Sequence, residues 1–508
     1  MSKATAALVL IMLGTILVAA RLHTYDEPLQ TDITGAAVIG HELLAGRALY
    51  ADMWDHKPPA LHLTHAVAIA LAGYGPGAVF LLNLLAGLVT LVGVYAAGCV
   101  VGSTSAGLWA AVFWTAISGD LWMQGNQPNA EVFINACVVW AFVLLLRADA
   151  GSGVGRFLAI GAIIAWGSLY KQIIVAPAAF LALAHVAAPP PGRGRGRALA
   201  DVGTIVAVGV AAWATLLAYF AAVGRFAPFF EAVFTYNRHY TQHTLAAPAQ
   251  LAFGFSEIFS PFLASTVPLV VLAILGTVVG TVTSRSRPWF LFLALVLGTP
   301  FAIWMPGAFA PHYYQLWLPA LVIGSGWALG VAGRIAGQRF AWVPQVAGGV
   351  VLTLLLANQA PLYMMPADDW SLIKYGPIFV EERKLASELH SMLLPGETFY
   401  EWGSEVGLYY HTGLRPPTGA FSVWAVVAGP AAWRNTRRIL ADLEPNPPEL
   451  FVLANWTQRW MHGTHPVLDW AFANYRPFPN RQERGPFSLY VLKGGKLEAR
   501  LQRATAAK

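Results

Sequence analysis

The chain has 508 residues, of which 56% are hydrophobic and 11% are charged, and its formal net charge is +6. Soluble domains carry roughly 25% charged residues, so this composition excludes an ordinary soluble protein and predicts many membrane-spanning helices. The basic residues fall in short segments between apolar runs, which is typical of membrane topology and argues against a nucleic-acid partner. The two cysteines, Cys99 and Cys137, lie inside apolar runs and are expected to be small packing residues.

Apolar runs predict helices along the first 360 residues. They lie at 5–20, 59–73, 77–100, 104–119, 130–147, 157–172, 173–188, 202–223, 262–283, 288–306, 314–333 and 340–358. The run 59–73 is shorter than the about 20 residues that a span requires, so we expect it to be half-length or re-entrant. The sequence therefore predicts 11–13 transmembrane helices.

Basic linkers orient these helices. The segments 191–197, 284–287 and 334–339 are rich in arginine, and the positive-inside rule places them in the cytoplasm. The first loop, 21–58, and the amphipathic stretch 224–261 then fall on the opposite face, with the turn around His312 and all residues after 358. We expect a multi-pass membrane protein, and a helix over 226–240 that lies on the membrane lipids.

From about residue 359 the composition changes, because charge, proline and tryptophan rise and the long apolar runs end. The patterns predict helices at 381–394 and 431–443 and strands at 398–402, 449–454 and 487–492. The predicted fold class is an all-α polytopic membrane domain over residues 1–358, joined to a small extracytoplasmic α/β domain over residues 359–508.

The first loop is the most informative part of the sequence. It contains Asp26 and Glu27 directly after the first apolar run, and His56 and Lys57 directly before the second. Charged groups are costly in or beside hydrocarbon. A membrane protein that gathers such groups in its first loop is expected to do chemistry there.

Five short motifs resemble one family when they are taken in order. They are Asp26-Glu27 after the first span, a helix ending in Gly46-Arg47-Ala48-Leu49-Tyr50 that runs on to Asp55-His56-Lys57-Pro58-Pro59, Pro128-Asn129-Ala130-Glu131, Lys171-Gln172, and Pro311-His312-Tyr313-Tyr314. Together they resemble the GT-C superfamily of membrane glycosyltransferases, in particular its bacterial family 39/83-like members, the protein O-mannosyltransferase-like and aminoarabinose-transferase-like enzymes. The resemblance covers roughly residues 1–360 and extends to the kind of tail domain.

This resemblance implies a hexosyl- or pentosyltransferase of the plasma (inner) membrane, with a polyprenyl-phosphate sugar donor and an extracytoplasmic active site under the first loop. The resemblance leaves the acceptor open among a lipid, a polysaccharide and a protein. Because the sugar is already joined to a fair leaving group, one carboxylate suffices as the base of a single inverting displacement. Asp26 is the expected base, with Glu27 as its partner or as a ligand of a divalent metal ion, whose requirement stays open. The alternative is that both residues only cap and solvate the end of the first helix.

Lys57 is the expected ligand of the leaving phosphate. The two prolines after it suit a helix start and would hold it at the level of the lipid headgroups, where it could neutralise developing charge. His56 could contact the same phosphate or the acceptor. The alternative for Lys57 is a generic contact with lipid headgroups.

Further substrate-binding candidates lie next to later spans. Lys171 and Gln172 stand between apolar runs, where a lysine requires a polar cavity or a partner. Glu131 opens a helix, which would also explain it without a functional role. His312 and Tyr313 could contact the acceptor or the phosphate, or could anchor the chain at the interface.

Other polar residues are expected to be structural. His62 and His65 lie three apart on an apolar helix, but no glutamate-bearing zinc motif accompanies them. Asp52 and Asp55 are expected to support the loop, and the sequence has no nucleotide-binding phosphate loop. The rival functional hypothesis is a transporter or flippase for a lipid-linked or small anionic substrate. Such a protein should carry ionisable residues near the bilayer midplane and repeated halves, which the sequence does not show.

Overall fold

The computed structural model describes residues 3–245, 259–283, 286–459, 465–479 and 482–506. The chain divides into two compact units. The helical unit comprises Met1–Tyr25, Phe80–Tyr219 and Thr241–Pro366, and the α/β unit comprises Asp26–Val79, Phe220–Tyr240 and Ala367–Lys508. Two predicted segments fall partly outside the described residues: 246–258 of the amphipathic stretch and 284–285 of a basic linker.

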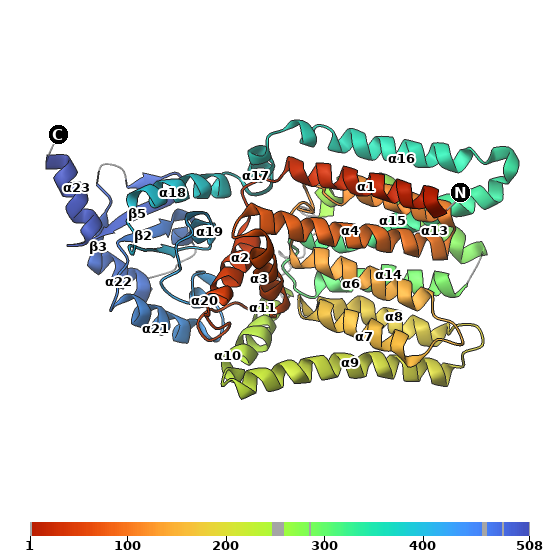
Figure 1. The fold of residues 1–508 in the computed structure, drawn as a ribbon, viewed down its shortest axis with the longest axis horizontal. Helices are drawn as coiled ribbons and strands as arrows, with labels where there is room; N and C mark the ends of the chain where they lie inside the picture. Colours follow the sequence, from red (N-terminus) through yellow and green to blue (C-terminus); the bar gives the residue numbers. More distant parts are fainter. Residues whose placement is uncertain (1–2, 246–258, 284–285, 460–464, 480–481, 507–508) are drawn as a thin grey trace. The chain divides into compact units, whose positions relative to one another are not determined.

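The helical unit is a bundle of long apolar helices that lie alongside one another (Figure 1). Short 3-10 turns, η1(Gln172–Ile174) and η4(Pro311–Trp317), precede two of these helices. The helices are α1(Lys3–His23), α4(Pro76–Val101), α5(Thr104–Ile117), α6(Ala130–Leu146), α7(Val154–Ser168), α8(Val175–Ala187), α9(Arg195–Ala222), α13(Phe259–Thr283), α14(Arg287–Trp304), α15(Leu318–Ala336) and α16(Val343–Gln359).

Seven helices within the described residues are long and apolar enough to cross a membrane, as judged by length and composition. Five further apolar helices have between 10 and 17 residues. The lower end of the predicted 11–13 spans would require four of these five shorter helices to cross as well. The polytopic, mostly helical fold class is confirmed, and the number of spans stays a prediction.

Small residues bring the helices of this bundle together. A Cβ atom added to Gly326 of α15 would lie 2.3 Å from the carbonyl oxygen of Ala106 in α5, and one added to Gly276 of α13 would lie 2.6 Å from the carbonyl oxygen of Gly324. Membrane helices associate through such close backbone contacts. Glycine therefore sets the spacing of α5, α13 and α15.

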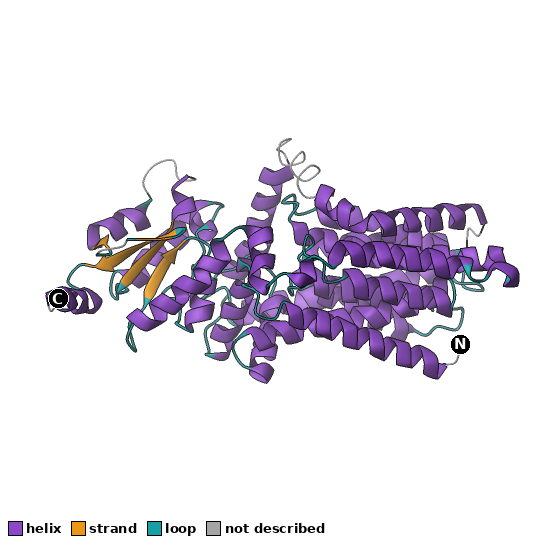
Figure 2. Ribbon diagram, turned by 90° about the horizontal axis from the view of Figure 1, so that it is seen from above, coloured by secondary structure: helices purple, strands orange, loops and turns teal. Residues whose placement is uncertain are grey.

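The α/β unit contains the strands, which Figure 2 shows gathered in one region. The sheet has the order β1-β2-β5-β3, and β4 pairs with β5. Strands β1(Phe399–Trp402) and β2(Leu450–Ala454) are parallel, while β2 and β5(Phe487–Leu492) are antiparallel, with Val452 opposite Leu489. Every residue of β1 and β2 is buried, as expected for strands that are covered on both faces. The three predicted strands are confirmed, and β3(Tyr475–Pro477) and β4(Glu483–Arg484) were not predicted.

Helices form most of the rest of the α/β unit. Both predicted tail helices are present, as α18(Ile378–Met392) and α21(Ala432–Leu443). The other elements are α2(Thr31–Leu44), α3(Ala60–Ala72), α10(Phe226–Phe230), the π-helical turn η2(Glu231–Tyr236), the start of α11(Asn237–Leu245), α17(Ala367–Tyr375), α19(Gly407–Thr412), α20(Trp424–Val427), α22(Pro466–Asn474) and α23(Lys496–Ala506).

The division into units differs from the predicted boundary at 358/359, because the first loop groups with the tail residues. The Thr31 hydroxyl donates to the carbonyl of Ser404 over 2.6 Å, and Arg415 pairs with the buried Glu42 at 2.7 Å. The Trp54 amide donates to the carbonyl of Gly419 over 2.9 Å. These contacts join residues more than 350 positions apart, so local patterns cannot reveal them.

Candidate functional site

Lys57 lies in a cluster of charged side chains within the α/β unit. Its ammonium nitrogen is 2.7 Å from Asp32 Oδ1, in the first turn of α2, and 4.0 Å from Asp55 Oδ2. The Lys57 side chain is 21% exposed and that of Asp32 is 38% exposed. The predicted phosphate ligand is therefore a partly exposed lysine that two carboxylates hold in place.

Asp55 is the centre of this cluster. Its Oδ1 accepts from the His56 amide over 2.7 Å and from the Lys57 amide over 3.4 Å. Its side chain also lies 3.1 Å from His56 Nδ1 and 3.0 Å from His62 Nε2. Burial acts to raise the pKa of Asp55, but Lys57, His56 and His62 outweigh burial and hold the pKa well below its usual value. Asp55 is thus ionised, and it fixes both the backbone and the side chains of the predicted motif.

The chain around Lys57 is held by two partly buried hydrogen bonds. The Tyr50 hydroxyl donates to the Lys57 carbonyl over 2.7 Å, and Asn237 Nδ2 donates to the His56 carbonyl over 2.8 Å. Tyr50 itself has a positive φ of 65°, which is uncommon for a residue other than glycine. Pro59 is the N-cap residue of α3, so the predicted helix start after Lys57 is confirmed.

Asp26 and Glu27 occupy different surroundings, although they are adjacent in sequence. Asp26 is exposed, and its backbone carbonyl accepts a 2.7 Å hydrogen bond from Arg383 of α18. Glu27 is buried and forms an ion pair with the equally buried Lys374 of α17. The Glu27 carboxylate is therefore paired with the Lys374 ammonium group, whereas Asp26 is exposed to solvent.

The predicted residues of the helical unit form a second cluster. Lys171 Nζ is 2.9 Å from Glu131 Oε1 and lies over the Tyr313 ring, 3.6 Å from its centroid. His312 Nε2 is 3.9 Å from Glu131 Oε2. Glu131 opens α6, Lys171 precedes η1, and the other two residues lie in η4. Residues from three separate segments thus converge on one buried carboxylate.

Gln124 completes this second cluster. Its Oε1 lies 3.2 Å from His312 Nδ1, and its backbone has a positive φ of 54°. Gln315 stabilises this conformation because its side-chain amide donates to the carbonyl of Met123 over 2.9 Å. Gln172 lies in η1 next to Lys171, at the edge of the same cluster.

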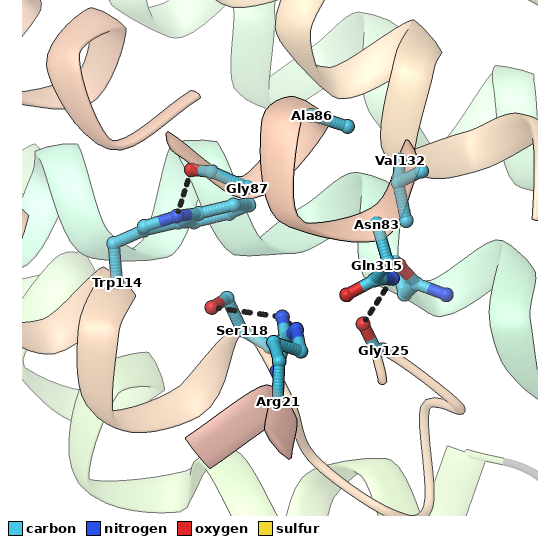
Figure 3. A pocket seen from close by; sticks show the side chains of 9 residues that line it. All are labelled: Arg21, Asn83, Ala86, Gly87, Trp114, Ser118, Gly125, Val132 and Gln315. Atoms are coloured by element: carbon cyan, nitrogen blue, oxygen red, sulfur yellow. Dashed lines mark hydrogen bonds between the residues drawn. The ribbon is translucent and has the colours of Figure 1, made fainter. Parts of the chain in front are cut away.

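A small cavity in the helical unit is not a substrate pocket. Arg21, Asn83, Trp114 and Gln315 are among its lining residues (Figure 3), and its volume is about 10 Å³. That volume holds about one water molecule, whereas ligand pockets have volumes of roughly 300 Å³ or more. Arg21 donates to the Ser118 carbonyl over 2.8 Å, so the cavity borders a structural contact between α1 and the end of α5.

The residues assigned to a metal ion do not fit one. Glu27, the second expected ligand, is held by the Lys374 ammonium group. Among the described residues, the structure groups no three His, Cys, Asp or Glu side chains in a way that could hold a metal ion.

Several contributing residues were not predicted for these sites, among them Gln124 of the second cluster. Asp32 and Lys374 were not singled out, and Asp55 and His62 were interpreted as structural. Two prolines and the start of α3 separate Asp55 from His62 in the sequence. Local patterns therefore gave no sign that the His62 ring would lie next to the Asp55 carboxylate. The density of ionisable groups in the first loop was the available signal, and it identified Lys57 and His56 but not their partners.

Comparisons with known proteins show which fold the chain shares. No family model matches the chain, and no curated protein matches it in sequence. Among solved structures, ArnT from Cupriavidus metallidurans bound to undecaprenyl phosphate is similar with a TM-score of 0.60 and 14% identity, over 98% of this chain and 99% of that chain. The oligosaccharyltransferase AglB from Archaeoglobus fulgidus, in complex with an inhibitory peptide and a dolichol-phosphate, gives 0.58 and 14%, over 97% and 74%.

The arabinofuranosyltransferase AftD from Mycobacteria is also similar, with a TM-score of 0.51 and 11% identity, over 97% of this chain and 40% of that chain. At these identities the likeness shows the fold alone. Nearly the whole chain takes part in each match, so both units belong to the shared architecture. The predicted resemblance is confirmed at this level: the chain has the fold of the GT-C membrane glycosyltransferases.

Proposed function

We propose that the protein is an inverting membrane glycosyltransferase that moves a sugar from a polyprenyl-phosphate donor to an extracytoplasmic lipid, polysaccharide or protein. The observation that carries this proposal is the first-loop cluster, in which Asp32 and Asp55 hold Lys57 beside His56. It supports the proposal because a phosphate leaving group requires a positioned cation. The GT-C fold and the polyprenyl phosphates bound to ArnT and AglB agree with this donor class.

The proposed reaction is a single displacement. Asp26 accepts the proton of the acceptor hydroxyl while the acceptor oxygen attacks the anomeric carbon. The bond between that carbon and the phosphate oxygen breaks, and the polyprenyl phosphate leaves with the electron pair. Lys57 neutralises the charge that develops on this phosphate, and His56 contacts the same group. The exposure of Asp26 supports its role as the base, because a base must reach the substrate.

Glu27 is assigned a supporting role in this scheme. Its ion pair with Lys374 fixes the backbone directly after Asp26, which would hold the base in one orientation. Zinc occurs in one AglB structure, but the Lys374 pair leaves Glu27 poorly suited to bind a metal here.

The second cluster is proposed to bind substrate within the helical unit. Lys171 and His312 offer N–H donors next to an apolar environment, and Tyr313 and Gln172 border them. Glu131 holds Lys171 in one position. An anionic or hydroxyl-bearing part of the donor or acceptor fits these donors.

The test measures sugar transfer by the purified protein in proteoliposomes. The donors are undecaprenyl-phosphate carrying a labelled hexose or pentose, offered with a lipid extract of the native envelope. Wild type is expected to transfer at least one sugar. The transfer rate should fall by a factor of about 10²–10⁴ in Asp26→Asn and by a factor of about 10²–10³ in Lys57→Ala. Lys384→Ala is the matched control, because Lys384 is an exposed lysine of the α/β unit, and it should keep full activity.

Two outcomes would overturn the proposal. Transport of the labelled lipid across the bilayer without any covalent transfer would favour the transporter hypothesis. Full activity of both Asp26→Asn and Lys57→Ala would leave a glycosyltransferase whose site lies elsewhere. Undecaprenyl-phosphate binding, measured separately by native mass spectrometry, distinguishes a lost donor from a lost chemical step.

A further inference from the structure

The α/β unit has a group of aromatic and basic side chains on its surface, outside its packed interior. Phe226 and Phe230 are 42% and 43% exposed, and Trp433 is 64% exposed. Arg434 and Arg437 are exposed on the same helix as Trp433. We call these five residues the aromatic–arginine face. Large exposed aromatic groups that lie together usually mark an interaction surface.

The phenylalanines form a ladder along one side of α10 and η2. Phe226 and Phe230 stack with ring centroids 5.6 Å apart, and Phe230 and Phe234 stack at 5.0 Å. The opposite side of the same helix is buried, because Phe229 stacks on Phe220 at 4.2 Å and meets Tyr50 at 5.2 Å. The segment therefore has one aromatic side packed inside the unit and another turned outwards.

Helix α21 adds the basic part of the face. Arg434 forms an ion pair with Glu231 of η2. The loop before α21 packs on η2 as well, since a Cβ atom at Gly429 would lie 2.8 Å from the Tyr236 ring. Arg437 lies 5.6 Å from the centroid of the Trp433 ring. The two elements thus form one continuous surface within the α/β unit.

The segment that precedes α10 in the chain indicates what this surface contacts. Helix α9 is a candidate membrane span that ends at Ala222, and α10 begins at Phe226. Four residues reach at most about 14 Å, so the ladder begins within that distance of Ala222, the last residue of this candidate span. The segments 225–240 and 432–443 together contain five arginines and two acidic residues. Aromatic rings with arginines are the groups that settle at a membrane surface.

We propose that the aromatic–arginine face docks on the bilayer surface and binds anionic phospholipid headgroups there. Phe226 and Phe230 would enter the boundary between headgroups and acyl chains, while Arg434 and Arg437 would contact lipid phosphates. Trp433 would lie between these layers, where amphipathic rings are favoured. This binding does not depend on the proposed transfer reaction, so either proposal can fail without the other.

The test places a reporter at the face of the full-length protein. Cys99 and Cys137 are replaced by alanine, Trp433 by cysteine, and a nitroxide label is attached. The protein is reconstituted into nanodiscs of phosphatidylcholine alone or with 30% phosphatidylglycerol (about one anionic lipid in three). Enhancement of the nitroxide's spin relaxation by a water-soluble paramagnetic reagent (the water-soluble relaxant) and by oxygen then reports the depth of the label. A label at Gln502→Cys, which is exposed on α23, is the matched control.

We expect the label at position 433 to be several-fold less accessible to the water-soluble relaxant in anionic nanodiscs than the label at position 502. Adding Arg437→Gln should remove most of the difference between the two lipid compositions. If Trp433→Cys fails to fold, Phe230→Cys carries the same label. Equal aqueous exposure at positions 433, 230 and 502 in both lipids would overturn the proposal. Protection that appears only in native membranes would also overturn it and would indicate a protein partner.

Discussion

Replacing Lys374 by methionine tests how strongly the α/β unit depends on its buried ion pair with Glu27. Both side chains are almost completely inaccessible to solvent. Removing one partner of a buried pair leaves an uncompensated charge and costs about 3–5 kcal/mol. For a unit of this size each kcal/mol lowers the melting temperature by roughly 2–4 °C, so Lys374→Met should melt roughly 6–20 °C below wild type.

The assay is a thermal melt of detergent-solubilised protein at one protein and detergent concentration. Glu27→Met should show a loss similar to that of Lys374→Met, and the double variant should regain part of it, because two apolar side chains leave no unpaired charge. Lys384→Met is the control: it breaks an exposed pair with Glu381 and should cost less than about 1 kcal/mol. Additive losses in the double variant would refute the interaction.

The same series separates two roles for Glu27. If its carboxylate only fixes the backbone next to Asp26, the stable double variant should retain sugar transfer. If the carboxylate takes part in the reaction, the double variant should be stable and inactive. The ratio of activity to folded protein, rather than activity alone, decides between these roles.

Three further predictions concern the α/β unit. Gly40→Ala should destabilise the unit by about 1–3 kcal/mol, because a Cβ atom at this position would lie 2.8 Å from the Ala66 amide nitrogen. A Cβ atom at Gly35 meets nothing within 4 Å, so Gly35→Ala should stabilise the unit by about 0.4–1 kcal/mol. Urea unfolding measures the free energy of unfolding of both variants. Burial, then the charges of Glu405 and Glu382, raise the pKa of Glu401 well above its usual value. The folded state then holds a proton that the unfolded state releases, so stability should fall as the pH rises above about 4.5, and Glu401→Gln should flatten that fall in melts across pH. The pKa of Asp55 is lowered instead, so its contribution is present above its unfolded pKa and is lost as the pH falls towards its folded pKa; Asp55→Asn should remove this acid-side loss in melts below pH 4.

Local patterns predicted most elements because their physical causes are local. The apolar runs of the helical unit are long enough to be distinctive, and β2 was predicted from the short apolar run Leu450–Ala454 between polar segments. Strand β3 contains Pro477 and only three residues, so propensity could not reveal it. The first loop could be recognised as functional because ionisable groups next to a membrane are costly.

The partners of the site residues could not be predicted in the same way. Lys374 lies more than 340 residues after Glu27, in an ordinary amphipathic helix whose sequence gives no sign of burial. Asp55 looked like a loop residue, because its role depends on α3 turning His62 back towards it. The residue types that perform the chemistry could be chosen from sequence, whereas the carboxylates that hold them required the structure.

The exposure of each lysine's partner determines whether that lysine can transfer its charge to a ligand. Separating Lys374 from Glu27 would strand a fully buried carboxylate, and separating Lys171 from Glu131 would do nearly the same, since Glu131 is 1% exposed. Either separation carries the cost of an unpaired buried charge. Lys171 is therefore expected to act on a ligand through its remaining N–H donors while it stays with Glu131.

Lys57 differs from both of these lysines. Its partner Asp32 is 38% exposed, so water can solvate that carboxylate when the pair opens, and an exposed ion pair contributes only about 0–1 kcal/mol. A dianionic or monoanionic phosphate that reaches Lys57 can replace Asp32 at little cost, while Asp55 keeps the backbone of the motif fixed. Asp32→Asn should consequently change undecaprenyl-phosphate binding little or strengthen it. Asp55→Asn should weaken that binding, because the lysine loses the group that positions it; the opposite order of these two effects would refute the assignment of Lys57.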